Sequence, residues 1–258
     1  MTAAAAQYAA LSRRAIVNTV RQPTSIVPSL VFPLLFAALS SAALDRSTVL
    51  PGFPPVDSFL QFLISTTIVQ GALFGAIAAG SDMATDIEGG FFERLVASPV
   101  ARTSILVGRV MGSAMLGFCQ AWLFIGVATV FGVDIEGGFV AMLMIAIVTS
   151  TVAAAIGAIS VSFALRTGSV EAVQGSFPLL FVMLFVSSAF FPRDLMNGWF
   201  KTVADLNPLS HLIEGLRTQV IAGVDVGDWL VSLGVAAGLF AVGIAAASLA
   251  LRRRLSAP

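Results

Sequence analysis

The sequence has very few reactive side chains. Its 258 residues include one cysteine, Cys119, one histidine, His211, and one lysine, Lys201. A single cysteine inside an apolar run supplies neither a disulfide framework nor a pair of thiolates for a metal ion. We interpret Cys119 as a small packing residue. His211 has no second ligand near it, so we interpret it as a polar group at the membrane interface and expect no metal site.

Charge is scarce as well. Charged residues make up 11% of the chain, hydrophobic residues make up 57%, and the mean hydropathy is +0.95, whereas soluble domains carry about 25% charged residues. Such a chain cannot keep its surface polar, so we predict an all-α integral membrane protein. The net charge of +0 and the isoelectric point near 6.6 leave no basic surface for nucleic acid, and we expect no nucleic-acid partner.

Six apolar stretches are long enough to be transmembrane helices, because a hydrocarbon core about 30 Å thick takes roughly 20 residues at about 1.5 Å each. They cover residues 26–44, 59–80, 105–130, 139–165, 170–191 and 229–251. The first contains Pro28 and Pro33, which we expect to kink it or to break its start. The fifth reaches spanning length only if residues 170–175 belong to it.

The stretch before the first span is rich in arginine and has no small-residue cleavage site, so we expect it to be retained. Residues 5–22 fit an interfacial helix on the membrane surface, with Leu11 and Ala15 on one side and Arg14 and Arg21 on another. A plain cytoplasmic lead-in fits the modest amphipathic pattern nearly as well.

The distribution of arginine and lysine predicts the orientation, because cytoplasmic loops are enriched in both. With the N-terminus in the cytoplasm, ten of the fourteen cations fall on that side, and only Arg46, Arg193, Lys201 and Arg217 fall outside. We therefore predict a multi-pass protein of the cytoplasmic (plasma) membrane with both termini cytoplasmic. Residues 82–100 then lie in the largest cytoplasmic loop, and residues 192–228 form the largest external segment.

The predicted spans contain small and uncharged polar residues. Glycines four residues apart indicate faces for close helix packing, namely Gly71 with Gly75 and Gly108 with Gly112. Gln70, Gln120 and Gln174 fit either hydrogen bonds between helices or a wet substrate path. No carboxylate or histidine lies at the centre of a span, which disfavours a proton-coupled carrier and an intramembrane enzyme.

The most charged stretch between spans runs from Asp82 to Arg109. Thr85 and Glu88 have the spacing of a capping box, which predicts a helix that begins near Asp86. Apolar residues at helical spacing follow, and Pro99 ends the helix because the residue before a proline resists the α conformation. The result is a short amphipathic helix that either rests on lipid headgroups or docks a soluble partner.

Two segments resemble the permeases of the type-2 ABC exporter class. In DIEGGFFERLVASPVARTSILVGR an acidic residue and glycine precede a basic residue, leucine, serine and proline, as they do in that class. In SSAFFPRDLMNGWFKTVADLNPLSHLIEGLR the sequence FFP follows the fifth span, and tryptophan, NPLS, glutamate and arginine come after it. The motifs occur in the expected order, and the resemblance, which looks most like the daunorubicin-resistance permease branch, covers essentially the whole chain.

The resemblance implies an exporter with two permease copies, as a homodimer or heterodimer in membrane lipid, and two ATP-binding cassette (ATPase) subunits. This chain has no GxxxxGK phosphate loop, so ATP and Mg would bind on a separate ATPase subunit. The chain itself would then be no enzyme and hold no cofactor. The resemblance also implies that residues 86–99 form a cytoplasmic coupling helix seated on the ATPase, and that residues 5–22 form a connecting helix at the membrane surface.

The resemblance assigns two sets of site residues. The expected coupling residues are Asp86, Glu88, Gly89, Phe91, Phe92, Glu93, Arg94, Leu95, Ser98 and Pro99. The expected external gate comprises Phe191, Pro192, Trp199, Asn207, Pro208, Glu214 and Arg217. The phenylalanine pair is bulkier than the pattern of the family leads us to expect.

We therefore predict the permease subunit of an ATP-driven exporter. It would move a hydrophobic or amphipathic substrate, such as a drug, lipid or glycolipid, out of the cytoplasm or the inner leaflet. The excess of arginine over lysine and the abundance of alanine indicate a bacterial source. The alternative is a non-transporting assembly or sensor subunit that docks a cytoplasmic partner.

Overall fold

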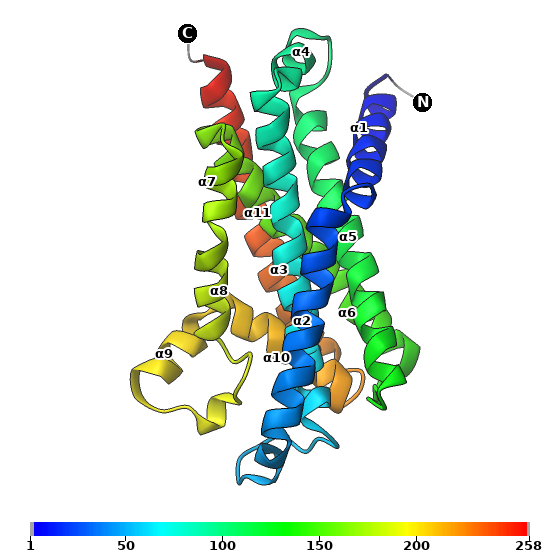
Figure 1. Cartoon of the computed structure of the whole chain (residues 1–258), viewed down its shortest axis with the longest axis vertical. Coiled ribbons are helices and arrows are strands. Elements are labelled where there is room, and N and C mark those ends of the chain that lie inside the picture. Colours follow the sequence, from blue (N-terminus) through cyan, green and yellow to red (C-terminus); the bar gives the residue numbers. More distant parts are fainter. Residues whose placement is uncertain (1–2, 257–258) are drawn as a thin grey trace.

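The chain forms a bundle of long helices that run alongside one another (Figure 1). The structure is a computed structural model that describes residues 3–256, apart from the side chains of residues 3–6, 20 and 23–25. These residues contain no strand. The α-helices are α1 (Ala3–Val20), α2 (Pro23–Leu44), α3 (Phe59–Glu88), α4 (Phe91–Ala97), α5 (Arg102–Val130), α6 (Gly138–Thr167), α7 (Val170–Gly175), α8 (Phe177–Phe185), α9 (Gly198–Leu206), α10 (Pro208–Ile221) and α11 (Val226–Ser256), with short 3₁₀ turns η1 (Asp45–Val49) and η2 (Arg193–Leu195).

Five helical segments of the described chain are long and apolar enough to cross a membrane. Four of them are α3, α5, α6 and α11, and the fifth, Ile26–Val49, consists of most of α2 and the turn after it. The four long helices extend beyond the predicted spans. The α2 helix runs through Pro28 and Pro33 without a break, because a bundle tolerates proline where neighbouring groups cover the freed backbone.

The predicted span over residues 170–191 is not one continuous helix. The chain forms α7 and α8 instead, which together make a shorter apolar segment, Val170–Phe185. Pro178 lies in the first turn of α8, where its missing N–H favours a new helix start over continuation of α7. Residues 186–192 then leave the helix before η2.

The α3 helix is the centre of the bundle. Within its most apolar window 89% of the residues are buried, compared with 17% for the first candidate span and 22% for α11. Its buried side chains form continuous clusters with α5 and α6 along most of its length. The helices α2, α5 and α6 therefore pack around α3, while α11 packs mainly against α6, and their outer faces are left free for lipid.

Both termini lie at the same end of the bundle, and α4 lies at that end as well (Figure 1). The α9 helix and the turns before α3 and α11 lie toward the opposite end. The segment of α7 and α8 leads the chain from the α4 end back toward the end of α9. The two regions that sequence analysis singled out, residues 82–100 and 192–228, are thus separated along the bundle axis.

Close helix contacts occur where the packing faces carry glycine. A Cβ on Gly71 would lie 2.3 Å from the Phe124 ring, and one on Gly108 would lie 2.6 Å from the Leu11 Cβ. A close contact with backbone occurs at Gly80, where a Cβ would lie 2.7 Å from the carbonyl oxygen of Ser160 in α6. These glycines let α1, α3, α5 and α6 approach closely without a hydrophobic driving force between helices.

We expect Gly80→Ala to destabilise the bundle, because the added methyl group meets α6 backbone that has no free space to move into. Overpacking of this kind costs about 1–3 kcal/mol, which corresponds to a fall in apparent Tm of about 2–10 °C for a chain of this size. Thermal unfolding in detergent measures the effect. Gly126→Ala is the matched control, since a Cβ there has no heavy atom within 4 Å and alanine favours the helix. Equal Tm values for the two variants would contradict the packing role of Gly80.

Candidate functional site

The short helix α4 follows directly on α3 and projects from the end of the bundle. The α3 helix ends at Glu88, Gly89 caps it, and Gly90 has a φ of 67°, a left-handed conformation that glycine adopts without strain. The α4 helix covers Phe91–Ala97 and ends where the Ser98 hydroxyl donates to the Leu95 carbonyl at 2.6 Å. Pro99 then separates it from α5.

The prediction that a helix begins near Asp86 is wrong, because α3 continues without interruption to Glu88. The Thr85 hydroxyl donates to the Ser81 carbonyl at 3.0 Å within α3 and does not cap a new helix. Asp86 and Glu88 therefore belong to the last turns of α3. Of the predicted coupling residues, only Phe91, Phe92, Glu93, Arg94 and Leu95 lie in α4.

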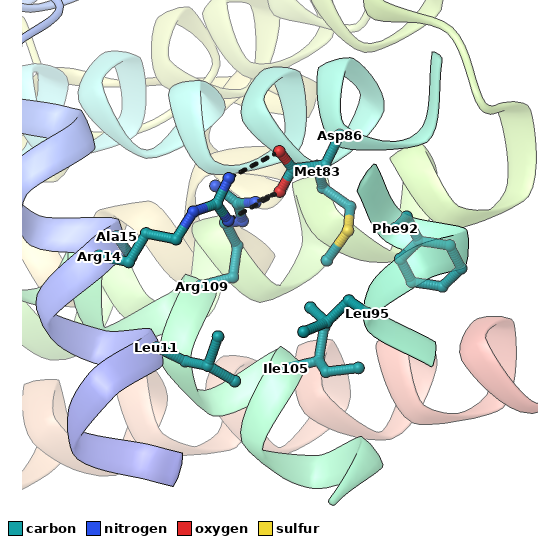
Figure 2. A pocket seen from close by; sticks show the side chains of 9 residues that line it. All are labelled: Leu11, Arg14, Ala15, Met83, Asp86, Phe92, Leu95, Ile105 and Arg109. Carbon is teal, nitrogen blue, oxygen red and sulfur yellow. Dashed lines mark hydrogen bonds and ion pairs between the residues drawn. The ribbon is translucent and has the colours of Figure 1, made fainter. Parts of the chain in front are cut away.

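A network of charged side chains joins α3 to α1 and α5 close to α4, and Figure 2 shows the part of it that Arg14, Asp86 and Arg109 form. Arg109 of α5 forms ion pairs with Asp82, at 3.3 Å, and with Asp86. Arg14 of α1 donates two hydrogen bonds to Asp86, at 3.0 and 3.2 Å. The Arg109 side chain is only 7% exposed and the two carboxylates are 11% and 15% exposed, so both signs of charge depend on each other for compensation.

Two amides of the N-terminal region complete this network. The side chain of Asn18 donates to one oxygen of Asp82 at 2.7 Å, and that of Gln22 donates to the other at 2.9 Å. Nearer the start of α1, the Gln7 amide donates to the Pro99 carbonyl and accepts from the Ala101 N–H, each at 3.1 Å. The α1 helix therefore binds the last turns of α3, just before α4, and the residues Pro99 and Ala101, just after it.

The α4 helix has one face toward the bundle and one away from it. Phe92 is buried in a cluster with Met83, Ile105 and Leu251, and Leu95 packs against the same cluster. Arg14 lies over the ring of Phe91, 4.1 Å from its centroid, within the range of a cation–π contact. Glu93, Arg94 and Ala97 are exposed on the outward face. In this region Gly89 caps α3 and Gly90 makes the turn. Phe91 is held by its contact with Arg14, and Phe92 is held by the apolar cluster.

The remaining predicted coupling residues are dispersed around α4. Glu88 is exposed, and its carboxylate accepts the N–H of Val170 at the start of α7 at 3.0 Å. Pro99 is exposed as well. Sequence reasoning left Arg14, Asn18, Asp82 and Arg109 out of the site. Asp82 and Asp86 lie four residues apart on one face of α3, and this spacing was the available signal.

The external segment contains a second polar cluster. Arg193 donates to Glu214 at 2.6 Å, forms an ion pair with Asp205 at 3.5 Å and lies 3.3 Å from the His211 Nδ1. His211 therefore lies in a polar cluster, and the described residues contain no group of three or more His, Cys, Asp or Glu side chains that fits a metal ion. Trp199 and Phe191 are exposed, and Pro192 is buried.

Side chains of α3 and α10 satisfy the backbone of the turn after α8. Arg217 is buried and donates to the carbonyls of Phe62, Ser188 and Ala189 at 3.2, 3.0 and 3.3 Å. Its guanidinium also lies 3.7 Å from the centroid of the Phe62 ring. Burial lowers the pKa of Arg217 to about 9, and the nearby Glu214 carboxylate opposes that shift. The guanidinium is therefore still charged at neutral pH.

Asn207 supports the same turn from the start of α10. Its amide donates to the Met183 carbonyl at 2.7 Å and to the Val186 carbonyl at 3.3 Å, and its side-chain oxygen caps α10 at the Leu209 N–H. Pro208 occupies the first turn of α10, where its missing N–H is not needed.

The three predicted path glutamines have different environments. Gln70 and Gln120 are buried, and the Gln120 amide donates to the Ser29 hydroxyl of α2 at 2.9 Å. Gln174 is exposed and lines a cavity of about 320 Å³ together with Ser81 and Phe177. The structure therefore places Gln120 in a contact between helices and Gln174 at a surface cavity.

Two apolar grooves flank α2. One, which we call the aromatic groove, has a volume of about 550 Å³ and is lined by Phe32, Phe74, Phe177 and Phe181 among other residues. It shares Pro28, Phe74 and Phe177 with the cavity at Gln174. The other groove, of about 640 Å³, lies between α2, α3 and α5 and includes Leu35, Ile64 and Phe131. The aromatic groove is the more amphipathic one, because it continues toward Ser81 and Gln174.

Comparison with known proteins supports a transport function. The family model of the ABC-2 type transporter matches residues 6–221. The chain is 26% identical to the daunorubicin resistance ABC transporter permease protein DrrB1 of Streptomyces coeruleorubidus over 218 residues, which cover 84% of this chain and 74% of that protein. It is 30% identical to the putative transport permease ycf38 of Pyropia yezoensis over 213 residues, 81% of this chain and 72% of that protein.

A third relative comes from another genus. The probable doxorubicin resistance ABC transporter permease protein DrrC of Mycobacterium tuberculosis is 23% identical over 218 residues, which cover 84% of this chain and 78% of that protein. The matched segment includes most of α1, the charged network, α4 and residues 192–221. The apolar helices, the two polar clusters and the match over most of the chain lead to one conclusion: the protein is a membrane permease that belongs to the ABC-2 type transporter family.

Proposed function

We propose that this chain is the permease subunit of an ATP-driven exporter that moves hydrophobic or amphipathic molecules, such as drugs, lipids or glycolipids, out of the cytoplasm or the inner leaflet. ATP and Mg bind to a separate ATP-binding cassette subunit, and a second permease copy completes the membrane part. The main support from the structure is α4, a short helix that is anchored at its inner face and exposed at its outer face.

The end that carries α4 is cytoplasmic in this proposal, and both termini lie on the same side. The exposed side chains at that end include the arginines Arg13, Arg21, Arg94, Arg102, Arg166, Arg252 and Arg253, which agrees with the enrichment of cations in cytoplasmic loops. The segment of α7 and α8, extended by the buried turn at residues 186–192, makes the sixth crossing. The turn is compatible with membrane depth because side chains satisfy its backbone.

The α4 helix is the element through which ATP-driven motion enters the bundle. Its outward residues Glu93, Arg94 and Ala97 form the surface for the ATPase subunit, while Phe92 and Leu95 attach it to the core. The network of Asp86 with Arg14 and Arg109 then connects the base of α4 to three helices at once. Closure of two ATPase subunits would move α4 and these helices as one unit.

The aromatic groove supports the proposed substrate class. Stacked and tilted phenylalanine rings of α2, α3 and α8 offer large apolar contact area. Ser81 and Gln174 at the α4 end of the adjoining cavity offer hydrogen bonds to a polar head. An amphipathic molecule would therefore place its polar part toward the cytoplasmic surface and its apolar part among the rings.

Arg94→Glu tests the docking surface of α4. We expect co-purification of the ATPase subunit to fall about tenfold, because the variant reverses a charge on the exposed face without touching the core. Arg166→Glu is the control, since Arg166 is exposed at the same end but lies on α6. Equal binding by both variants and the parent protein would rule out this face. Preserved binding of the ATPase without any transport in proteoliposomes would favour the alternative, a non-transporting assembly or sensor subunit.

Arg109→Gln tests the charged network. The variant removes the cation that lies between the carboxylates of Asp82 and Asp86. Removing one partner of a buried ion-pair network lowers the free energy of unfolding by about 3–5 kcal/mol. We expect a lower Tm and a loss of ATP-dependent transport that exceeds the loss of ATPase binding. Arg102→Gln on the same helix serves as the control, because Arg102 is exposed. An unchanged Tm and unchanged transport in Arg109→Gln would contradict the proposed role.

Phe181→Ala tests the aromatic groove. We expect the substrate concentration for half-maximal ATPase stimulation to rise about 2- to 10-fold, since aromatic contacts contribute about 0.5–1.5 kcal/mol each. Proteoliposomes that contain the permease, its ATPase subunit and a graded series of amphipathic dyes provide the assay. Phe163→Ala is the control, because Phe163 is 39% exposed on α6 and lies outside the groove. A similar shift in both variants would show that the groove does not select substrates.

A further inference from the structure

The C-terminal helix α11 shares an apolar cluster with α4 through Leu251 and adds one charged contact to it, the side chain of Arg254. Its guanidinium carbon lies 5.7 Å from the centroid of the Phe92 ring, and one of its nitrogens lies 3.8 Å from the Glu93 carboxylate. Another nitrogen donates to the Leu165 carbonyl, in the last turn of α6, at 3.2 Å. One cation therefore contacts α4 and the C-terminal end of α6 at the same time.

The absence of a side chain at Gly168 leaves space for the Arg254 guanidinium. Gly168, which caps α6, has a φ of 68°, and a Cβ there would lie 3.3 Å from an Arg254 nitrogen. A guanidinium at the C-terminal end of a helix also interacts favourably with the last carbonyls and with the helix dipole. The contact with Leu165 is therefore the fixed point from which Arg254 extends to α4.

The two arginines that precede Arg254 behave differently. Arg252 and Arg253 are exposed, and within residues 3–256 their side chains form no ion pair or hydrogen bond that the structure records. The Arg254 side chain is 28% exposed. All three arginines contribute equally to the positive charge of this end of the bundle, so charge alone does not explain why the third one turns inward.

Arg14 and Arg254 lie on neighbouring rings of α4. Arg14, from the N-terminal helix, covers Phe91 at 4.1 Å, and Arg254, from the C-terminal helix, lies over Phe92 at 5.7 Å. Both distances lie within the range of about 6 Å in which a guanidinium is attracted to the face of an aromatic ring. The phenylalanine pair thus has a physical role that leucine could not fill, because an aliphatic side chain has no π face to attract a guanidinium.

We propose that Arg254 is a positioning residue that holds α4 against the pair of α6 and α11 and passes its movement to that pair. The chain itself connects α4 to α3 and α5, and α11 packs more extensively against α6 than against any other helix. Without Arg254, the direct contacts of α4 with α6 and α11 among the described residues would be those of the apolar cluster that joins Phe92 to Leu165 and Leu251. This inference rests on the proposed function of α4 as the element that meets the ATPase.

Distance measurement between spin labels tests the position of α4 in the full-length permease in lipid nanodiscs. Labels replace Ala97 on α4 and Leu249 on α11, both exposed, in a chain with Cys119→Ser. We expect Arg254→Ala to broaden the distance distribution at least about twofold, because the cation–π contact and the link to α6 are both lost. Arg253→Ala should leave it unchanged. An unchanged distribution in Arg254→Ala would overturn the proposal.

A second measurement separates positioning from folding and from the proposed function itself. In proteoliposomes with the ATPase subunit, Arg254→Ala should lower the number of molecules transported per ATP at least about fivefold, with co-purification of the ATPase retained. Arg254→Lys keeps the charge but not the planar guanidinium group, so we expect it to restore part of the transport per ATP. An equal loss of transport per ATP in Arg253→Ala would overturn the positioning role of Arg254. If the parent permease neither binds nor stimulates an ATPase subunit, the proposed function fails, and the label distances still decide whether Arg254 positions α4.

Discussion

The requirement that buried polar groups find partners inside the chain shapes this permease. In an apolar bundle an unpaired charge or an unpaired backbone group costs several kcal/mol. The chain buries charged side chains at one place and non-helical backbone at a distant one, and it supplies partners for both. Near α4, the carboxylates of Asp82 and Asp86 meet the guanidinium of Arg109 and the polar side chains of α1. Beyond α8, the open backbone of residues 186–192 meets Arg217, Asn207 and Thr66.

The two polar regions differ in what they fix. The network near α4 joins side chains of three helices, so it sets how α1, α3 and α5 lie relative to one another. The second region joins side chains to backbone carbonyls, and it thereby keeps a non-helical stretch in a single conformation. Arg217 alone reaches both the Phe62 carbonyl of α3 and the carbonyls of Ser188 and Ala189. An arginine suits this position because its rigid fork presents several donors in fixed directions.

Composition and length of the apolar runs were enough to predict five of the six spans and the membrane class, because both depend on residues close in the sequence. The close contacts at Gly71 and Gly108 were predictable from their spacing with Gly75 and Gly112, whereas the contact at Gly80 was not predicted. The start of α4 was not predictable, since the spacing of Thr85 and Glu88 fits a helix interior as well as a capping box. In the structure Thr85 bonds to Ser81 inside α3, and Gly89 with Gly90 supplies the break. A glycine pair was the better signal for that boundary than the capping pattern.

The partners of the buried charges could not be predicted from one sequence. Arg14 and Asp86 are 72 residues apart, and Arg217 and Phe62 are 155 residues apart. Nothing in local pattern links such positions, so Arg14 looked like one more surface cation. The coupling and gating roles of the predicted residues stay predictions. What the structure adds to them is the set of contacts through which they would act.

The central helix connects the two polar regions directly. The α3 helix has 30 residues, which gives a rod about 45 Å long. Phe62 and Thr66 near its start hold Arg217 and the Ala189 carbonyl, and Asp82 and Asp86 near its end hold Arg109 and Arg14. Because most of α3 is buried in close contact with α5 and α6, it has little room to bend. If the proposed motion of α4 tilts the adjoining end of α3, the other end must carry the turn after α8 with it, so residues 192–228 would respond without a separate signal.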